Sequence, residues 1–145
     1  MNGSSTTNLT FQEFIYAGNM TIRPEPTGLS AARTKILSVA NDLRFNEESR
    51  SDLLLAVGEA LSNAYLYGSV DRNADLIYLG WHFADDILTV TVKDEGPGFR
   101  PYESKKRDGR SSFRGYGFGI MRRSVDHVHF EFDDGAKVIL KKRVD

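Results

Sequence analysis

The chain contains no cysteine, no excess of charge of either sign and no long hydrophobic run. The absence of cysteine excludes disulfide bonds and thiolate metal sites, and it fits a reducing compartment. With 19 basic and 20 acidic residues the formal net charge is -1, so no overall field draws the chain to nucleic acid or anionic lipid. We therefore expect no direct binding to nucleic acid.

The missing hydrophobic run bears on location. Nowhere do about 18 apolar residues follow one another, and the opening residues MNGSSTTN lack the basic start and apolar stretch of a secretory signal. Residues 1–8 are small and polar, which predicts a disordered segment. Residues 9–145 have the length of one domain, and a chain that is 40% hydrophobic can build a core. We expect a single cytoplasmic domain with no membrane attachment.

Two helices are predicted in the first half of the chain. Apolar residues recur at three- and four-residue steps over 29–43, which predicts an amphipathic helix entered from Gly28 or Ser30. Asn46 can cap a second helix, and Gly68 can end it. The helices therefore come as a consecutive pair.

Strand patterns account for most of the remaining chain. Short pieces at 9–18 and 19–24 look like strands that Gly18 separates. Later segments rich in β-branched and aromatic residues predict two hairpins, with a short third helix at 117–126 between them. The predicted hairpin strands are 76–83, 87–93, 127–132 and 136–142. A helix pair followed by hairpins predicts an α+β fold, a two-layer sandwich with one helical face on an antiparallel or mixed sheet.

The stretch EALSNAYLYG places an acid and an amide four residues apart on the second predicted helix. Glu59 and Asn63 are therefore neighbours on its surface. A carboxylate with an amide oxygen suits a hard cation such as Mg²⁺, or acid-base chemistry beside one. A polar stripe that simply meets water is the commoner explanation for such a pair taken alone.

A second polar stretch, DEGPGF, follows a predicted strand directly. Gly96 and Gly98 leave the backbone free to approach a ligand, and Asp94 can accept hydrogen bonds from an amino group. An ordinary turn at the end of a strand would also explain these residues.

A third stretch, GYGFG at 115–119, leads straight into the third predicted helix. Exposed amides at a helix N-terminus bind phosphate oxygens, and glycines let those oxygens come near. A hinge or tight packing would use the same glycines. The dinucleotide-binding and P-loop patterns are both absent from the sequence.

The order of these three stretches resembles the N, G1 and G2 boxes of the GHKL ATPase superfamily, whose ATP-binding domain is called the Bergerat fold. The resemblance implies that ATP is bound, that Asn63 holds Mg²⁺ and that Asp94 reads the adenine amino group. It further implies that the nucleotide is contacted by Gly96, Gly98, Gly115, Gly117 and Gly119.

A free-standing unit of this length, with GLSAARTKI before VGEALSNAYLYG, resembles the anti-sigma-factor serine/threonine kinases of bacteria. The resemblance implies a protein kinase in which Glu59 activates a serine hydroxyl on a STAS-type anti-anti-sigma partner. It also implies that a sigma factor is sequestered, that Arg33 lies at a partner interface and that a homodimer is possible. A histidine kinase would need a phosphoacceptor histidine upstream, whereas every histidine lies in or after the predicted hairpins.

Two further features refine this interpretation. Ala136 stands where the family often has a threonine near the adenine, so one hydrogen bond is lost. The loop between the glycine stretches is either a solvated loop or an ATP lid, in which Arg114 is best placed for the γ-phosphate. Its cations are Lys105, Lys106, Arg107, Arg110 and Arg114. The alternative functions are a nucleotide-gated interaction module and a phosphatase-activating regulator, neither of which transfers phosphate.

Overall fold

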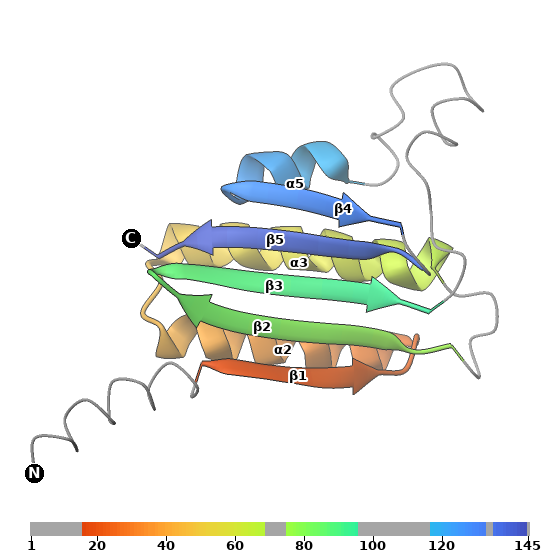
Figure 1. Ribbon diagram of the computed structural model, residues 1–145. Coiled ribbons are helices and arrows are strands. Elements are labelled where there is room, and N and C mark those ends of the chain that lie inside the picture. Colours follow the sequence, from red (N-terminus) through yellow and green to blue (C-terminus); the bar gives the residue numbers. More distant parts are fainter. Residues whose placement is uncertain (1–15, 69–74, 96–116, 133–134, 145) are drawn as a thin grey trace, which may run out of the picture.

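The computed structural model describes residues 16–68, 75–95, 117–132 and 135–144. Figure 1 shows the strands side by side with helices behind them. The elements are β1 (Ala17–Ile22), α2 (Pro26–Asp42), α3 (Glu47–Tyr67), β2 (Ile77–Ala84), β3 (Ile87–Asp94), α5 (Phe118–Ser124), β4 (His127–Glu131) and β5 (Lys137–Arg143).

The strands form one sheet in the order β1-β2-β3-β5-β4, and every neighbouring pair is antiparallel. Helices α2 and α3 cover one face of this sheet, and α5 lies beside β4 and packs against α3 (Figure 1). The predicted α+β two-layer sandwich is therefore confirmed, with an antiparallel sheet. No helix of the described residues is long and apolar enough to cross a membrane.

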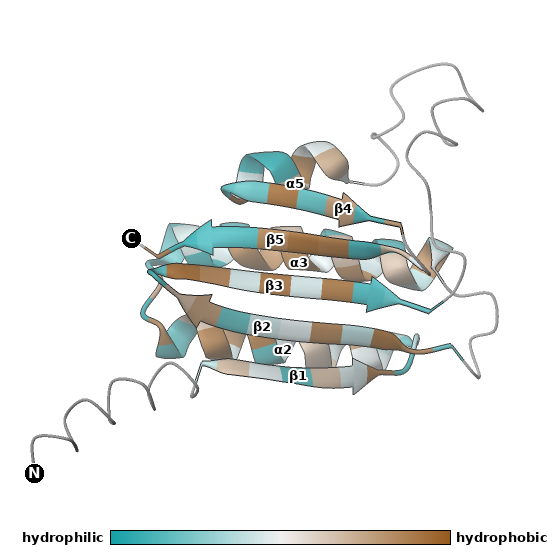
Figure 2. Ribbon diagram, in the orientation of Figure 1, coloured by the Kyte–Doolittle hydropathy of each residue, from teal (hydrophilic) through white to brown (hydrophobic). Residues whose placement is uncertain are grey.

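The core lies between the sheet and the helices. Leu88, Val90 and Val92 of β3 are buried, while the residues between them are only half-buried, so the strand alternates as a one-sided sheet requires. Figure 2 shows this alternation as bands of differing hydropathy along the strands. Each fully buried side chain of this size stabilises the fold by about 1.5–3 kcal/mol.

Helix α3 is the central element of the helical layer. Its N-terminus is capped as predicted, because the side-chain oxygen of Asn46 accepts a hydrogen bond of 2.8 Å from the backbone N–H of Ser49. Two acids, Glu47 and Glu48, occupy the first turn, where they complement the helix dipole. The helix ends at Gly68, also as predicted. Its two termini are therefore specified by local sequence.

Two predicted boundaries were wrong. Gly18 lies inside β1 rather than between two strands. Position 18 is a glycine for a packing reason, because a Cβ atom there would come within 2.6 Å of the Trp81 ring. The glycine thus makes room for an indole and does not break the strand. Helix α2 begins at Pro26, two residues before Gly28, since the fixed φ of proline suits the first turn of a helix. Residues 9–15, also predicted as strand, lie outside the described part of the chain.

The predicted hairpin around Asp85 and Asp86 is confirmed. Both residues have positive φ, 55° and 63°, as the two central residues of a type I′ turn require. The turn pairs β2 with β3 in a register that places Ile77 opposite Asp94. Strand β3 therefore delivers Asp94 to the end of the sheet where α3 finishes.

Candidate functional site

The acid and amide of α3 lie one turn apart, as predicted, but they differ in environment. Asn63 belongs to the buried face of the helix and keeps only 3% of its surface exposed. Glu59 is half-buried and lies on the solvent side of the same helix. The pair therefore spans the edge between the core and the surface, so that one member is fixed by packing and the other is accessible.

Glu59 is brought against the start of α5. Gly117, which precedes α5, has a left-handed backbone with φ of 69°. A Cβ atom on Gly117 would overlap the Oε1 atom of Glu59 and lie 2.8 Å from its Cδ atom. Glycine is thus required here for conformation and for close approach. The structure brings together the acid of the first predicted stretch and a glycine of the third.

Helix α5 is held in place by contacts at both of its ends. Phe118 is 1% exposed, and its ring lies 4.4 Å from that of Phe130 on β4. At the other end, the Nζ of Lys142 donates a hydrogen bond of 2.9 Å to the carbonyl of Ser124. A seven-residue helix has little stability alone, so these contacts set where Gly117 lies.

Asp94 is a buried carboxylate at the end of β3, with 2% of its surface exposed. Its backbone N–H donates to the carbonyl of Ala136 at 3.0 Å, and its Oδ1 accepts from the N–H of Ala136 at 3.3 Å. Two glycines, Gly68 and Gly135, lie against it so closely that neither could carry a Cβ atom without a shift. The carboxylate is therefore enclosed where α3, β3 and β5 meet.

The neighbouring acid, Glu95, is exposed and bonded differently. Its carboxylate accepts hydrogen bonds from the Tyr78 hydroxyl at 2.6 Å and from the backbone N–H of Leu76 at 2.9 Å. The bond from Tyr78 is the main cause that lowers the pKa of Glu95, and the same bond raises the pKa of Tyr78. This pair ties β2 to the chain just after Asp94.

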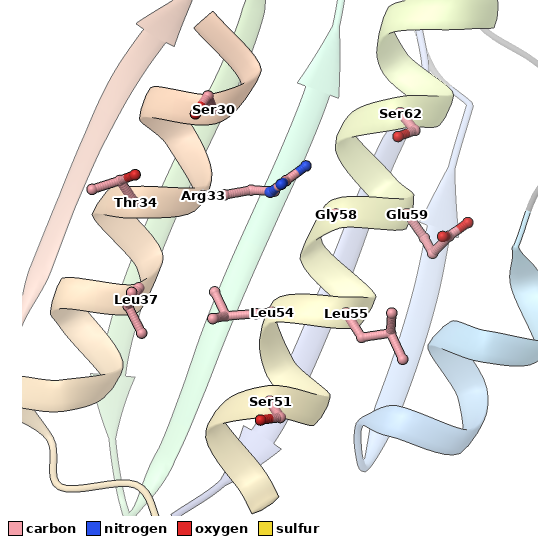
Figure 3. A pocket seen from close by; sticks show the side chains of 10 residues that line it. All are labelled: Ser30, Arg33, Thr34, Leu37, Ser51, Leu54, Leu55, Gly58, Glu59 and Ser62. Atoms are coloured by element: carbon pink, nitrogen blue, oxygen red, sulfur yellow. The ribbon is translucent and has the colours of Figure 1, made fainter. Parts of the chain in front are cut away.

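A groove of about 610 Å³ runs between α2 and α3 on the side away from the sheet. Figure 3 shows Arg33 reaching from α2 toward α3, and Glu59 on the side of α3 that faces away from α2. Leu55, one turn before Glu59, is 51% exposed. The full lining is Ser30, Arg33, Thr34, Leu37, Ser51, Leu54, Leu55, Gly58, Glu59 and Ser62.

Several predicted site residues cannot be placed. The lid cations and the remaining glycines lie outside the described residues, so their roles stay predictions. These residues are Gly96, Gly98, Lys105, Lys106, Arg107, Arg110, Arg114 and Gly115. Gly119 is described, in the first turn of α5, where it is exposed.

The sequence analysis missed two residues of the Asp94 corner. Gly68 is predicted only as the end of the second helix, and Gly135 lies between two predicted hairpin strands without a role of its own, yet both lie against Asp94. The signal that could have identified them is weak, since glycine at a helix end or a turn is ordinary. Leu55, which is exposed one turn before Glu59, is a further lining residue that the sequence analysis does not single out.

Comparisons with known proteins agree with this geometry. The histidine kinase-like ATPase domain family matches residues 22–142. The serine-protein kinase RsbW of Oceanobacillus iheyensis is 25% identical over 134 residues, which cover 86% of this chain and 85% of that protein. The anti-sigma F factor of Clostridium acetobutylicum is 30% identical over 123 residues, which cover 79% of this chain and 84% of that protein.

A solved structure also matches the fold. It contains the RsbU and RsbW domains of a Mycobacterium tuberculosis protein, and it superposes with a TM-score of 0.68 at 15% identity. The match covers 88% of this chain but 32% of that longer chain, so this chain spans about a third of its length. The Bergerat fold expected from the three motifs is thereby confirmed. The chain belongs to the histidine kinase-like ATPase family, among the anti-sigma factors and RsbW-type serine-protein kinases.

Proposed function

We propose that this protein is an ATP-dependent serine/threonine protein kinase that acts as an anti-sigma factor. It phosphorylates a STAS-type anti-anti-sigma partner and sequesters a sigma factor, in the cytoplasm. The observation that carries the proposal is the position of Glu59. This acid lines the open groove between α2 and α3 and also lies against Gly117 at the start of α5. The Glu59 carboxylate therefore lies between the groove proposed for the partner and the glycine stretch proposed for the phosphates, where it could assist transfer of a phosphoryl group from one to the other.

The proposed role of Glu59 is that of a general base. A half-buried carboxylate that borders a groove can accept the proton of an incoming hydroxyl. Phosphoryl transfer depends mainly on positioning and on charge neutralisation, so no covalent intermediate on the protein is needed. The absence of a side chain at Gly117 leaves room for the carboxylate of Glu59 beside the start of α5.

The nucleotide side of the proposal rests on Asp94 and Asn63. ATP supplies the phosphoryl group when bound, and a buried carboxylate fits a ligand whose base presents an amino group. Two of the residues that lie against Asp94, Gly68 and Gly135, lack Cβ atoms, which supports close approach of a flat group. The proposed nucleotide contacts in the unplaced segment, including Arg114, rest on the motif alone.

Magnesium fits the same residues. In the described part of the chain, no cluster of three or more histidine, cysteine, aspartate or glutamate side chains could hold a metal by itself. Mg²⁺ is commonly bound by one or two protein oxygens together with substrate phosphates and water. We therefore assign Asn63 as its protein ligand in the proposed complex.

The partner side of the proposal rests on the groove. Arg33 and Glu59 are the two charged residues among those that line it, and leucines from both helices provide apolar surface. Arg33, the residue expected at a partner interface, and Glu59, the expected base, therefore both line this groove. Figure 3 shows Arg33 extending from α2 toward α3, with Glu59 on the far side of α3. Leu55, which also lines the groove, is 51% exposed and adds apolar surface that a partner could cover.

The test is transfer of phosphate to a protein. The wild type is incubated with labelled ATP, Mg²⁺ and a STAS-type anti-anti-sigma protein of the same organism, and the modified residue is identified by mass spectrometry. We expect phosphoserine or phosphothreonine on the partner. In Glu59→Gln, transfer should fall by about a hundred to ten thousand fold, while nucleotide affinity and sigma-factor binding should change little. Glu48→Gln, in the exposed first turn of the same helix, serves as the control.

Two outcomes would overturn the proposal. If Glu59→Gln transferred phosphate at the wild-type rate, Glu59 would not be the general base. A wild type that binds ATP and partner yet modifies no serine or threonine would favour the nucleotide-gated interaction module, in which no phosphate is transferred.

A further inference from the structure

Helix α3 ends at a glycine whose conformation does not require glycine. Gly68 has φ of -94° and ψ of -15°, in the right-handed region that any residue adopts. Glycines at helix ends usually provide a left-handed φ, and Gly135 and Gly117 do have positive φ. Alanine at a right-handed position normally stabilises a helix end relative to glycine. The presence of glycine at position 68 therefore needs a different physical reason.

That reason is the Asp94 carboxylate. A Cβ atom on Gly68 would overlap Oδ2 of Asp94 and lie 2.5 Å from its Cγ atom. The carboxylate has little freedom to move aside, because it is buried and its Oδ1 accepts the N–H of Ala136. The end of α3 thus packs directly on the carboxylate, in space that a single methyl group would take.

Gly135 encloses the same residue from the other side, but it is less informative. A Cβ atom on Gly135 would overlap the backbone oxygen of Asp94, and the φ of 102° strains any other residue. A substitution at Gly135 would therefore combine backbone strain with a clash against the Asp94 backbone, and the two could not be told apart. Gly68 is the position at which the contact with the carboxylate can be examined without a change of backbone region.

We propose that Gly68 is a positioning residue, which holds the Asp94 carboxylate in the orientation that reads the nucleotide base. This inference rests on the proposed function of Asp94. Asn63 and Gly68 lie on one helix, so the proposed magnesium ligand and the support of the base reader are parts of one rigid element. Position 68 would then determine selectivity for adenine without touching the nucleotide.

The first test measures the contact without nucleotide, by thermal unfolding of Gly68→Ala, Asp94→Ala and the double variant. Gly68→Ala should lower the Tm by about 2–4 °C in the wild-type background. In the Asp94→Ala background the same change should have little effect or raise the Tm, because the carboxylate is gone. A Cβ at 68 would also lie 2.7 Å from the Ala64 carbonyl oxygen, but that contact is common to both backgrounds and cancels in the cycle.

A matched control for this cycle lies within the same helix. A Cβ on Gly58 would meet Arg33 at an ordinary 3.6 Å, so Gly58→Ala should raise the Tm. An equal loss of Tm for Gly68→Ala in both backgrounds would overturn the proposed contact with Asp94.

The second test measures nucleotide selectivity by calorimetric titration with Mg-ATP and Mg-GTP. Gly68→Ala should weaken ATP at least about tenfold and reduce the preference for ATP over GTP, as expected when the adenine amino group loses its hydrogen-bond acceptor. Gly80→Ala, on β2 where a Cβ would meet an ordinary contact at 3.8 Å, should bind ATP like the wild type.

The outcomes separate this inference from the function on which it rests. A folded Gly68→Ala that keeps the wild-type affinity and selectivity would overturn the positioning role and leave the proposed kinase intact. A wild type that binds no ATP would overturn the proposed function and this role together, whereas the unfolding cycle would still report the contact.

Discussion

The two surfaces of helix α3 are built in different ways. At its C-terminal end, Gly68 touches the buried Asp94, and no space is left for one more methyl group. Farther along the helix, α3 borders an open groove whose lining includes Arg33 of α2 and Leu55 of α3, and Leu55 is 51% exposed. The difference indicates that the closed end, where we propose that the nucleotide binds, has little room for a larger side chain, whereas exposed side chains of the groove can be exchanged with less effect on the core.

The largest effect is expected from Asp94→Asn at the closed end of α3. The amide keeps an oxygen for the N–H of Ala136, so the fold should survive. Loss of a charged acceptor costs about 1.5–3 kcal/mol, so affinity for ATP should fall roughly ten- to a hundredfold in a calorimetric titration. Asp42→Asn, an exposed carboxylate at the end of α2, is the control. Equal losses for ATP and GTP would argue against Asp94 as the adenine reader.

The open groove is tested by Arg33→Glu and Leu55→Ser. Each should weaken binding of the STAS-type partner or sigma factor about 5- to 30-fold, the range of a moderate interface hot spot, in a pull-down or interferometry titration. Nucleotide affinity and Tm should stay unchanged, because both side chains are exposed. Lys141→Glu, an exposed charge reversal on the sheet, serves as the matched control. Loss of nucleotide binding in either groove variant would contradict the separation of the two surfaces.

A variant at Ala136 is expected to bind ATP more tightly than the wild type. Ala136 is 2% exposed, and its backbone N–H and carbonyl both hydrogen-bond to Asp94. A hydroxyl at position 136 would therefore lie near the Asp94 carboxylate. One added hydrogen bond contributes about 0.5–1.5 kcal/mol, so Ala136→Ser should bind ATP about two to ten times more tightly. Weaker binding together with a lower Tm would show that the closed end has no room even for one oxygen atom.

The smallest effect is expected from Tyr78→Phe, which removes the main cause of the lowered pKa of Glu95. A carboxyl whose folded pKa is lowered contributes stability above its unfolded pKa, and that contribution is lost as pH falls through the folded value. The Tm difference between wild type and variant should therefore be small at pH 7 and should shrink as the pH falls below the usual pKa range of a glutamate. Both groups are exposed, so a large difference at neutral pH would contradict this account.

Local features of the fold could be predicted from sequence because their causes are local. The Asn46 cap and the turn at Asp85 and Asp86 depend on residues a few positions apart. Gly18 was misread because its role depends on Trp81, which reaches it only through strand pairing. Tertiary contacts of this kind override local propensity.

The candidate site was predictable in its parts but not in its contacts. The order of motifs identified Glu59, Asn63 and Asp94, since each stretch carries a recognisable chemistry. Spacing in sequence carries no information on the approach of Gly68 to Asp94, which depends on how α3 packs across the end of the sheet. The groove likewise exists only because α2 and α3 lie side by side, as Figure 1 shows.

The double requirement at Gly117 has a genetic consequence. Any side chain there would strain the left-handed backbone that begins α5 and would also displace the Glu59 carboxylate. A screen for alleles that keep nucleotide binding but lose phosphoryl transfer should therefore return changes at Glu59 and none at Gly117. Position 117 should yield only complete loss-of-function alleles.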